Sequence, residues 1–108
     1  MEVDFSEFER LDIRVGRIVS AERVEGARKL LKFIVDFGEF RRQSLAGLGH
    51  IYDPEHFAGK QYVFIVNLKP RKIRGIVSEC MILAAVSDEE LVVPIAPESQ
   101  VPDGCRVL

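Results

Sequence analysis

The segment Leu11-Asp12-Ile13-Arg14-Val15-Gly16-Arg17-Ile18 decides the fold class of this chain. Its first apolar residues alternate with polar ones, which is the pattern of a strand with one buried face. Past Gly16 the apolar position shifts to Ile18, as a bulge or a sharp bend requires. A strand that bends in this way can belong to two faces of a barrel.

Further strands follow along the chain. Apolar residues alternate again over 31–37, and Gly38 then supplies a turn into residues 40–46, which predicts a hairpin. Two later segments, 62–66 and 81–86, are continuously apolar, so we expect both to be strands buried on two faces. Residues 87–90 then turn the chain into the short apolar segment 91–95.

Two short helices are also predicted, one before the first strand and one between later strands. Residues 5–10 suit one or two helical turns with an apolar edge. Residues 53–59 begin with a capping Asp53 followed by proline and end at Gly59, which are helix start and stop signals. About five strands with a helix between the third and fourth are the element order of the OB-fold, an all-β, five-stranded Greek-key barrel. We therefore expect one such domain over residues 1–108, with an SH3-like barrel as the alternative.

Composition agrees with a soluble globular chain. The 108 residues are 47% hydrophobic and 30% charged with a net charge of −2, which excludes both acid-rich disorder and a histone-like cation. No apolar run approaches the roughly 20 residues of a membrane span, and residues 1–10 are acidic where a signal peptide is basic and then apolar. We expect a cytoplasmic location with no membrane partner. Cys80 and Cys105 are interpreted as small buried or half-buried thiols.

The near-neutral net charge conceals a basic middle. Between Arg28 and Arg74 there are ten basic and four acidic residues, and the densest cluster is Lys69-Pro70-Arg71-Lys72-Ile73-Arg74. A solvated surface loop is one interpretation of such a run. However, proline and the following Gly75 constrain the turn, so it can present its cations in a defined geometry. A polyanion responds to the local field of such a patch, so nucleic acid is a candidate ligand.

Catalytic groups are few. His50 and His56 are the only histidines, and their spacing suits neither a strand face nor adjacent helical turns. Glu79 beside Cys80 would raise the pKa of that thiol, whereas a reactive cysteine needs nearby cations. We therefore expect a non-catalytic protein without a metal site or a cofactor.

Several of these segments together resemble the signature of the structure-specific tRNA-binding domain family. They are Asn67–Gly75 followed by Ser78–Ala85, the first strand 11–18 and the helix region 52–59. The family includes C-terminal domains of methionyl-tRNA synthetases and stand-alone archaeal beta subunits of that enzyme. The resemblance implies an OB-fold, tRNA as ligand and methionyl-tRNA synthetase as a possible partner.

A second branch of the same superfamily is an alternative. Residues 25–29, leading into 34–38, also look like CsaA, a group of stand-alone homodimers proposed as export-related chaperones for unfolded polypeptides. Residues 44–48 depart from the small-residue and glutamine pattern that CsaA shows after its third strand. The synthetase-type interpretation is therefore favoured.

The tRNA hypothesis gives each group a role. The cations would neutralise phosphates, Asn67 and Ser78 would offer hydrogen bonds, and Met81 would give an apolar shelf under an unstacked base. The alternatives are a place in the core for Met81 and a backbone bond at the strand end for Asn67. The predicted RNA-binding residues are Arg28, Lys29, Arg41, Arg42, Asn67, Lys69, Arg71, Lys72, Arg74, Ser78 and Met81.

A homodimer is also expected, because the stand-alone members of the family that this chain resembles are dimers. The chain has apolar residues near both ends with no obvious partner inside one barrel. The alternative is that both ends fold back on their own barrel. These residues are Phe5, Phe8, Val101, Val107 and Leu108.

Overall fold

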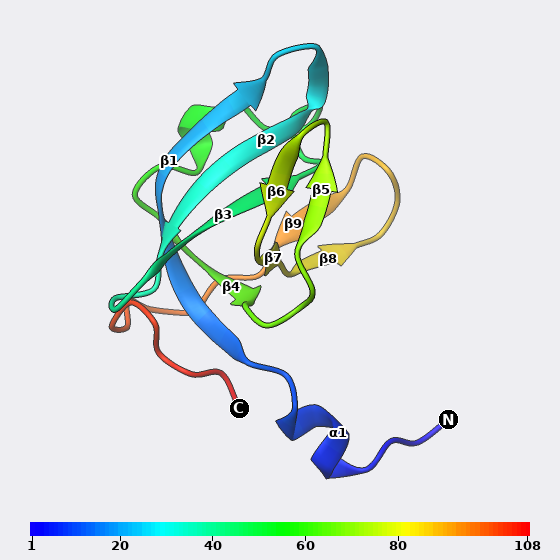
Figure 1. The fold of residues 1–108 in the computed structure, drawn as a ribbon, viewed down its shortest axis with the longest axis vertical. Coiled ribbons are helices and arrows are strands. Elements are labelled where there is room, and N and C mark those ends of the chain that lie inside the picture. The colour runs from blue at the N-terminus through cyan, green and yellow to red at the C-terminus, as the bar shows by residue number, and fades with distance from the viewer.

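The computed structural model describes all 108 residues as a small, mostly antiparallel β structure (Figure 1). A five-stranded sheet has the order β3-β2-β1-β4-β7, and β5–β6 and β8–β9 form two separate hairpins. The elements are α1 (Phe5–Glu9), β1 (Ile13–Val24), β2 (Ala27–Asp36), β3 (Arg41–Ala46), the 3-10 helix η1 (Pro54–His56), β4 (Gln61–Ile65), β5 (Arg71–Ile73), β6 (Ile76–Ser78), β7 (Met81–Ile82), β8 (Ala84–Val86) and β9 (Val92–Pro94).

The long strand β1 belongs to two faces, as its sequence predicts. Residues 13–17 pair with β4, and residues 17–24 pair with β2. The register is irregular between Ile18 and Ser20, just past the position where the apolar pattern shifts. Gly16 allows close packing at the bend, because a Cβ there would lie 2.5 Å from Val35 Cγ1 and 2.6 Å from Phe37 Cε1.

The barrel core contains alternate residues of β2, side chains from β1, β3 and β4, and Phe57. Leu31, Phe33 and Val35 are fully buried, which confirms the predicted alternation. Phe57, directly after η1, is also fully buried and lies 4.9 Å from the Phe33 ring, centroid to centroid. Helix η1 lies between β3 and β4, where the sequence predicts a helix.

The outer face of β1 and β4 holds a second apolar cluster. Ile13, Val15, Val63 and Ile65 are buried there. Side chains from α1 and from the C-terminal segment, including Phe8 and Val107, cover them. Strand β4 is therefore buried on both faces, as predicted.

The barrel closes where β3 meets residues 77–80, through side chains as well as backbone. Gln43 and Glu79 form a reciprocal pair. The Gln43 N–H donates to Glu79 Oε1 at 2.9 Å, and the Glu79 N–H donates to the Gln43 carbonyl at 2.8 Å. Ser44 Oγ donates to the Cys80 carbonyl at 2.8 Å. This closed arrangement confirms the expected OB-like, all-β fold.

Three local predictions are wrong. Residues 81–86 do not form one strand buried on both faces: β7 pairs with β4, β8 pairs with β9, and Val86 is 68% exposed. The Asp53 side chain does not cap η1 but lies 3.0 Å from Arg23 Nη2. Cys80 is buried as expected, whereas Cys105 is exposed. Neither helix is long and apolar enough to cross a membrane.

Candidate nucleic-acid interface

The basic residues divide into two groups by their partners. Seven of the fifteen lysines and arginines lie within 3.6 Å of a carboxylate oxygen. The other eight have no ion-pair partner, and all of them fall between residues 28 and 74. Their positive field is therefore not neutralised at close range and is available to an anionic ligand. The eight unpaired cations are Arg28, Lys29, Arg42, Lys60, Lys69, Arg71, Lys72 and Arg74.

The densest basic segment forms a two-stranded hairpin. Arg71 pairs with Ser78 and Lys72 pairs with Val77, so the hairpin register fixes both cations on β5. Arg74 and Gly75 have φ angles of 52° and 79°, the positive values that a two-residue type I′ turn requires. The predicted constrained turn is therefore confined to Arg74 and Gly75, whereas Arg71 and Lys72 lie on strand β5 and Lys69 precedes it.

Four predicted site residues line one surface pocket of about 120 Å³: Lys69, Arg71, Ser78 and Met81. Met81 is 43% exposed, so the alternative that placed it in the core is wrong. The prediction did not include the other residues that line this pocket. They are Leu45, Leu68, Ile73, Glu79 and Cys80.

Cys80 gives this pocket an uncharged inner surface. Burial raises the pKa of its thiol to about 12, although a hydrogen bond with Ser44 acts in the opposite direction. The thiol is therefore neutral at physiological pH, and a buried protonated thiol is a poor nucleophile.

Asn67 and Ser78 both form hydrogen bonds within the chain. Asn67 Nδ2 donates to the Arg10 carbonyl and Asn67 Oδ1 accepts the Asp12 N–H, each at 2.8 Å. Ser78 Oγ accepts the Leu45 N–H at 3.1 Å. Asn67 thus links the end of β4 to the start of β1, and Ser78 links β6 to β3 where the barrel closes. For both side chains a contact with RNA stays a prediction.

Arg74 and Arg28 lie toward the tip of the β1–β2 hairpin. A Cβ built on Gly26 would lie 3.7 Å from Arg74 Nη1, so the two hairpin tips are adjacent. Figure 1 shows both tips at the same end of the barrel. Arg28 and Lys29 begin β2 near this tip and are exposed. Arg28 lines a neighbouring hollow of about 430 Å³.

Arg41 and Arg42 lie elsewhere. They begin β3, at the end of the barrel opposite the two hairpin tips (Figure 1). Arg41 lies 3.6 Å from the Asp36 carboxylate, and the Arg42 guanidinium stacks over the Phe40 ring at 4.3 Å from its centroid. The predicted residues therefore form two groups rather than one patch.

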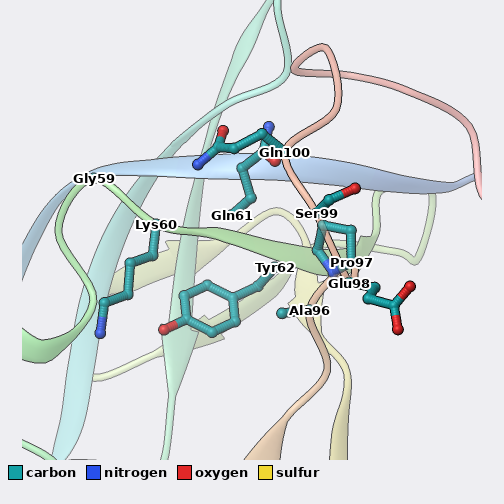
Figure 2. Close-up of a pocket in the computed structure, with 9 residues that line it drawn as sticks. All are labelled: Gly59, Lys60, Gln61, Tyr62, Ala96, Pro97, Glu98, Ser99 and Gln100. Atoms are coloured by element: carbon teal, nitrogen blue, oxygen red, sulfur yellow. The ribbon is translucent and has the colours of Figure 1, made fainter.

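A separate hollow of about 360 Å³ lies between the start of β4 and residues 96–100 (Figure 2). Lys60, Tyr62 and Glu98 are among the side chains that line it, and none of the predicted site residues reaches it. Neither histidine lines this hollow or the pocket beside Met81. His50 Nε2 lies 3.2 Å from the Glu89 carbonyl, and His56 stacks on Tyr52.

Comparisons with known proteins show which family the chain is similar to. The tRNA_bind family of tRNA-binding domains matches residues 13–106. Methionine–tRNA ligases of Archaeoglobus fulgidus and Methanothrix thermoacetophila are 43% and 44% identical over 98% and 97% of this chain. The matches cover only 16% and 15% of those two enzymes, so the chain spans about one sixth of their length.

Two solved structures match over the whole of both chains. A MetRS-related protein from Pyrococcus horikoshii superposes with a TM-score of 0.93 at 38% identity. The chaperone CsaA from Bacillus anthracis superposes with a TM-score of 0.92 at 31% identity. With a family match over most of its length and relatives above 40% identity, the chain belongs to the tRNA-binding domain family.

Proposed function

We propose that residues 1–108 act as a single, non-catalytic module that binds the tRNA backbone through its unpaired cations. The observation that carries this proposal is the confinement of all eight unpaired cations to residues 28–74. Each phosphate that a cation contacts releases a condensed counterion, which gives binding that falls with salt. Contacts of this kind select shape and charge rather than base sequence. In a cell, the module would act in the cytoplasm.

The module would serve methionyl-tRNA synthetase, either as a beta subunit or as an accessory domain. Support comes from the identity to the corresponding sixth of the Archaeoglobus fulgidus enzyme. Recovery of a synthetase together with tRNA, when the tagged protein is pulled from its own cells, is the expected result.

A homodimer is part of the same proposal. The apolar residues near the two ends lie together rather than on opposite sides of the barrel. Phe5 is 69% exposed and Leu108 is 92% exposed, so the ends are not fully covered by their own barrel. Together with Phe8, Leu11 and Val107, these two line a groove of about 230 Å³. A second copy covering this groove would place two basic surfaces on one particle and increase avidity for tRNA.

Titration of the purified protein into labelled tRNA at several salt concentrations tests the binding proposal. The double variant Arg71→Ala/Lys72→Ala should weaken binding to every tRNA about equally. It should also reduce the slope of log affinity against log salt by roughly 1 to 2. The control variant, Arg10→Ala, removes an exposed cation that pairs with Glu7 and lies outside residues 28–74, so it should leave the slope near its wild-type value.

A thermal melt accompanies each titration, because exposed cations outside a packed network change stability by less than about 0.5 kcal/mol. Equal salt slopes for the wild type and Arg71→Ala/Lys72→Ala would contradict the assignment of the hairpin. An affinity for tRNA that does not change with salt concentration would contradict the tRNA proposal.

A CsaA-like chaperone for unfolded polypeptides is the second candidate. The observation that favours it is the exposure of apolar side chains on and beside the β8–β9 hairpin, with Val86 at 68%, Leu91 at 54% and Val93 at 48%. Exposed apolar patches are typical of surfaces that bind proteins. Tight binding of a reduced, unfolded polypeptide with no tRNA binding at low salt would favour this function over the first.

A further inference from the structure

Glu79 is the one acidic residue that lines the pocket beside Lys69 and Arg71. It forms no ion pair with either cation. A carboxylate repels phosphate, so backbone binding does not explain a negative charge at this position. Its bond to Gln43 explains why the residue is held in place, and its negative charge on the pocket wall would attract a ligand group that carries N–H donors.

The position of the Glu79 carboxylate is well defined. Its Oε1 accepts the Gln43 N–H at 2.9 Å, while its own backbone N–H donates to the Gln43 carbonyl at 2.8 Å. The residue is half-buried, and its Oε2 forms no hydrogen bond within the chain. One oriented acceptor therefore remains free, and Oε1 retains a second lone pair.

The remaining walls suit a flat, apolar face. Met81 and Leu68 are 43% and 41% exposed, and Leu45 and Ile73 complete the lining. The volume of about 120 Å³ is well below the roughly 300–1,000 Å³ of pockets that enclose drug-sized ligands. A methionine thioether packs favourably against an aromatic ring. The pocket therefore fits one planar ring group rather than a longer segment of a ligand.

We infer that this pocket holds one unstacked guanine of the bound RNA, with Glu79 on the Watson–Crick edge of the base. The inference deepens the proposed function and depends on it. Guanine is the base whose edge presents two adjacent N–H donors, at N1 and N2, next to the O6 acceptor. The donors match the carboxylate oxygens, and O6 matches a cation from Lys69 or Arg71. Unstacked bases read on this edge are the usual route to sequence preference in RNA recognition.

Defined pentanucleotides test the inference without requiring any variant. Fluorescein-labelled UUGUU, UUIUU and UUAUU are titrated into the wild-type protein and followed by anisotropy. Inosine lacks only the N2 amino group of guanine, so UUGUU should bind at least about fivefold more tightly than UUIUU. Adenine lacks both adjacent donors, so UUAUU should also bind at least about fivefold more weakly than UUGUU.

The variant Glu79→Gln retains the side-chain shape and an oxygen that can accept the Gln43 N–H, but it removes the charge. Its preference for UUGUU over UUIUU should disappear, while its affinity for UUUUU should stay equal or increase. A misfolded protein would instead lose affinity for every pentanucleotide. The control Glu89→Gln changes an exposed carboxylate outside the pocket and should keep the preference.

Equal affinity of the wild-type protein for UUGUU and UUIUU overturns the inference. If the same preparation binds tRNA in a salt-dependent way, the guanine pocket fails alone; if it binds no tRNA, the proposed function fails as well. A third outcome would favour a peptide site and overturn the inference. In that case the protein binds no pentanucleotide but binds an unfolded polypeptide tightly, and Met81→Ala weakens the binding of that polypeptide.

Discussion

Arg74 has a backbone conformation that asparagine adopts more readily. Its φ of 52° lies in the left-handed region, and the type I′ turn that it forms with Gly75 prefers asparagine at this position. Arg74→Asn should therefore raise the free energy of unfolding by about 0.5–1 kcal/mol. The same change removes an unpaired cation, so affinity for tRNA should fall while stability rises. Urea denaturation and the tRNA titration measure the two effects separately.

The control for this change is Lys72→Asn, which removes a neighbouring cation from the extended strand β5. Asparagine has a low preference for strands, so no gain in stability is expected there. A midpoint of unfolding for Arg74→Asn at or below that of the wild type would show that the turn is not strained.

The buried thiol of Cys80 makes stability depend on pH in the alkaline range. Its pKa rises from an ordinary value of 9.0 to about 12 in the folded chain, mainly through burial. Between these values the unfolded chain releases the proton and the folded chain keeps it, so the free energy of unfolding should fall as the pH rises above about 9. Urea denaturation at pH 7, 9 and 10 measures this slope.

The variant Cys80→Ala identifies the contribution of the thiol. Burial also raises the pKa of Tyr62, which acts in the same direction and remains in the variant. The alkaline slope should therefore become shallower in Cys80→Ala without disappearing. An identical slope in both proteins would assign the effect to other groups.

At the scale of single elements, the bend of β1 depends on the absence of a side chain at Gly16. A Cβ there would meet Val35 and Phe37 at 2.5–2.6 Å, and both neighbours are buried in the core with little room to move. Gly16→Ala should therefore destabilise the fold by about 1–3 kcal/mol, as overpacking of a filled core does. Thermal and urea unfolding measure the loss.

Gly47→Ala is the matched control, because a Cβ at that exposed position would have no atom within 4 Å. Its stability should stay near that of the wild type. Equal stabilities for the two alanine variants would mean that β1 can shift to accommodate the methyl group at no cost.

The strands that the sequence predicts well are those whose burial follows a local period. Residues 31–37 alternate strictly, and the structure buries alternate side chains as a result. The expectation of one strand over 81–86 is wrong because its apolar residues serve two pairings: β7 pairs with β4, and β8 pairs with β9. A change of partner in the middle of an apolar run leaves no signal in hydrophobic periodicity.

The hairpin β5–β6 and its pocket were harder to predict. Arg74-Gly75 is not one of the usual type I′ sequences, and strands of three residues give too few positions for a period. Residues that share the pocket, such as Leu45 and Glu79, are 34 positions apart in the chain. Only closure of the barrel brings them together, so local patterns indicated the cations but not the acidic residue among them.

At the scale of the whole molecule, we expect two copies to associate through the groove between α1 and the C-terminus. Sedimentation equilibrium at micromolar concentration should give about twice the 12.2 kDa of one chain. Phe5→Ser removes an apolar side chain that is 69% exposed, so it should weaken the dimer with little effect on the fold of one chain.

Val86→Ser is the control, because Val86 is also apolar and is 68% exposed but lies on the β8–β9 hairpin. It should leave the dimer intact. Dissociation by Val86→Ser instead of Phe5→Ser would place the interface on that hairpin, and a mass near one chain for the wild type would exclude a stable dimer.

The Asn67 side chain joins two parts of the molecule to which we assign different tasks. It holds the backbone at Arg10 and Asp12, next to α1, and it begins the connection that leads into the basic hairpin. The Asp12 amide hydrogen exchanges with solvent only when its 2.8 Å bond to Asn67 opens. A ligand that orders the hairpin should slow this exchange, as followed by NMR in deuterated water. The exchange rate of the Asp12 amide, at the edge of the expected dimer contact, should therefore report whether a ligand is bound to the hairpin.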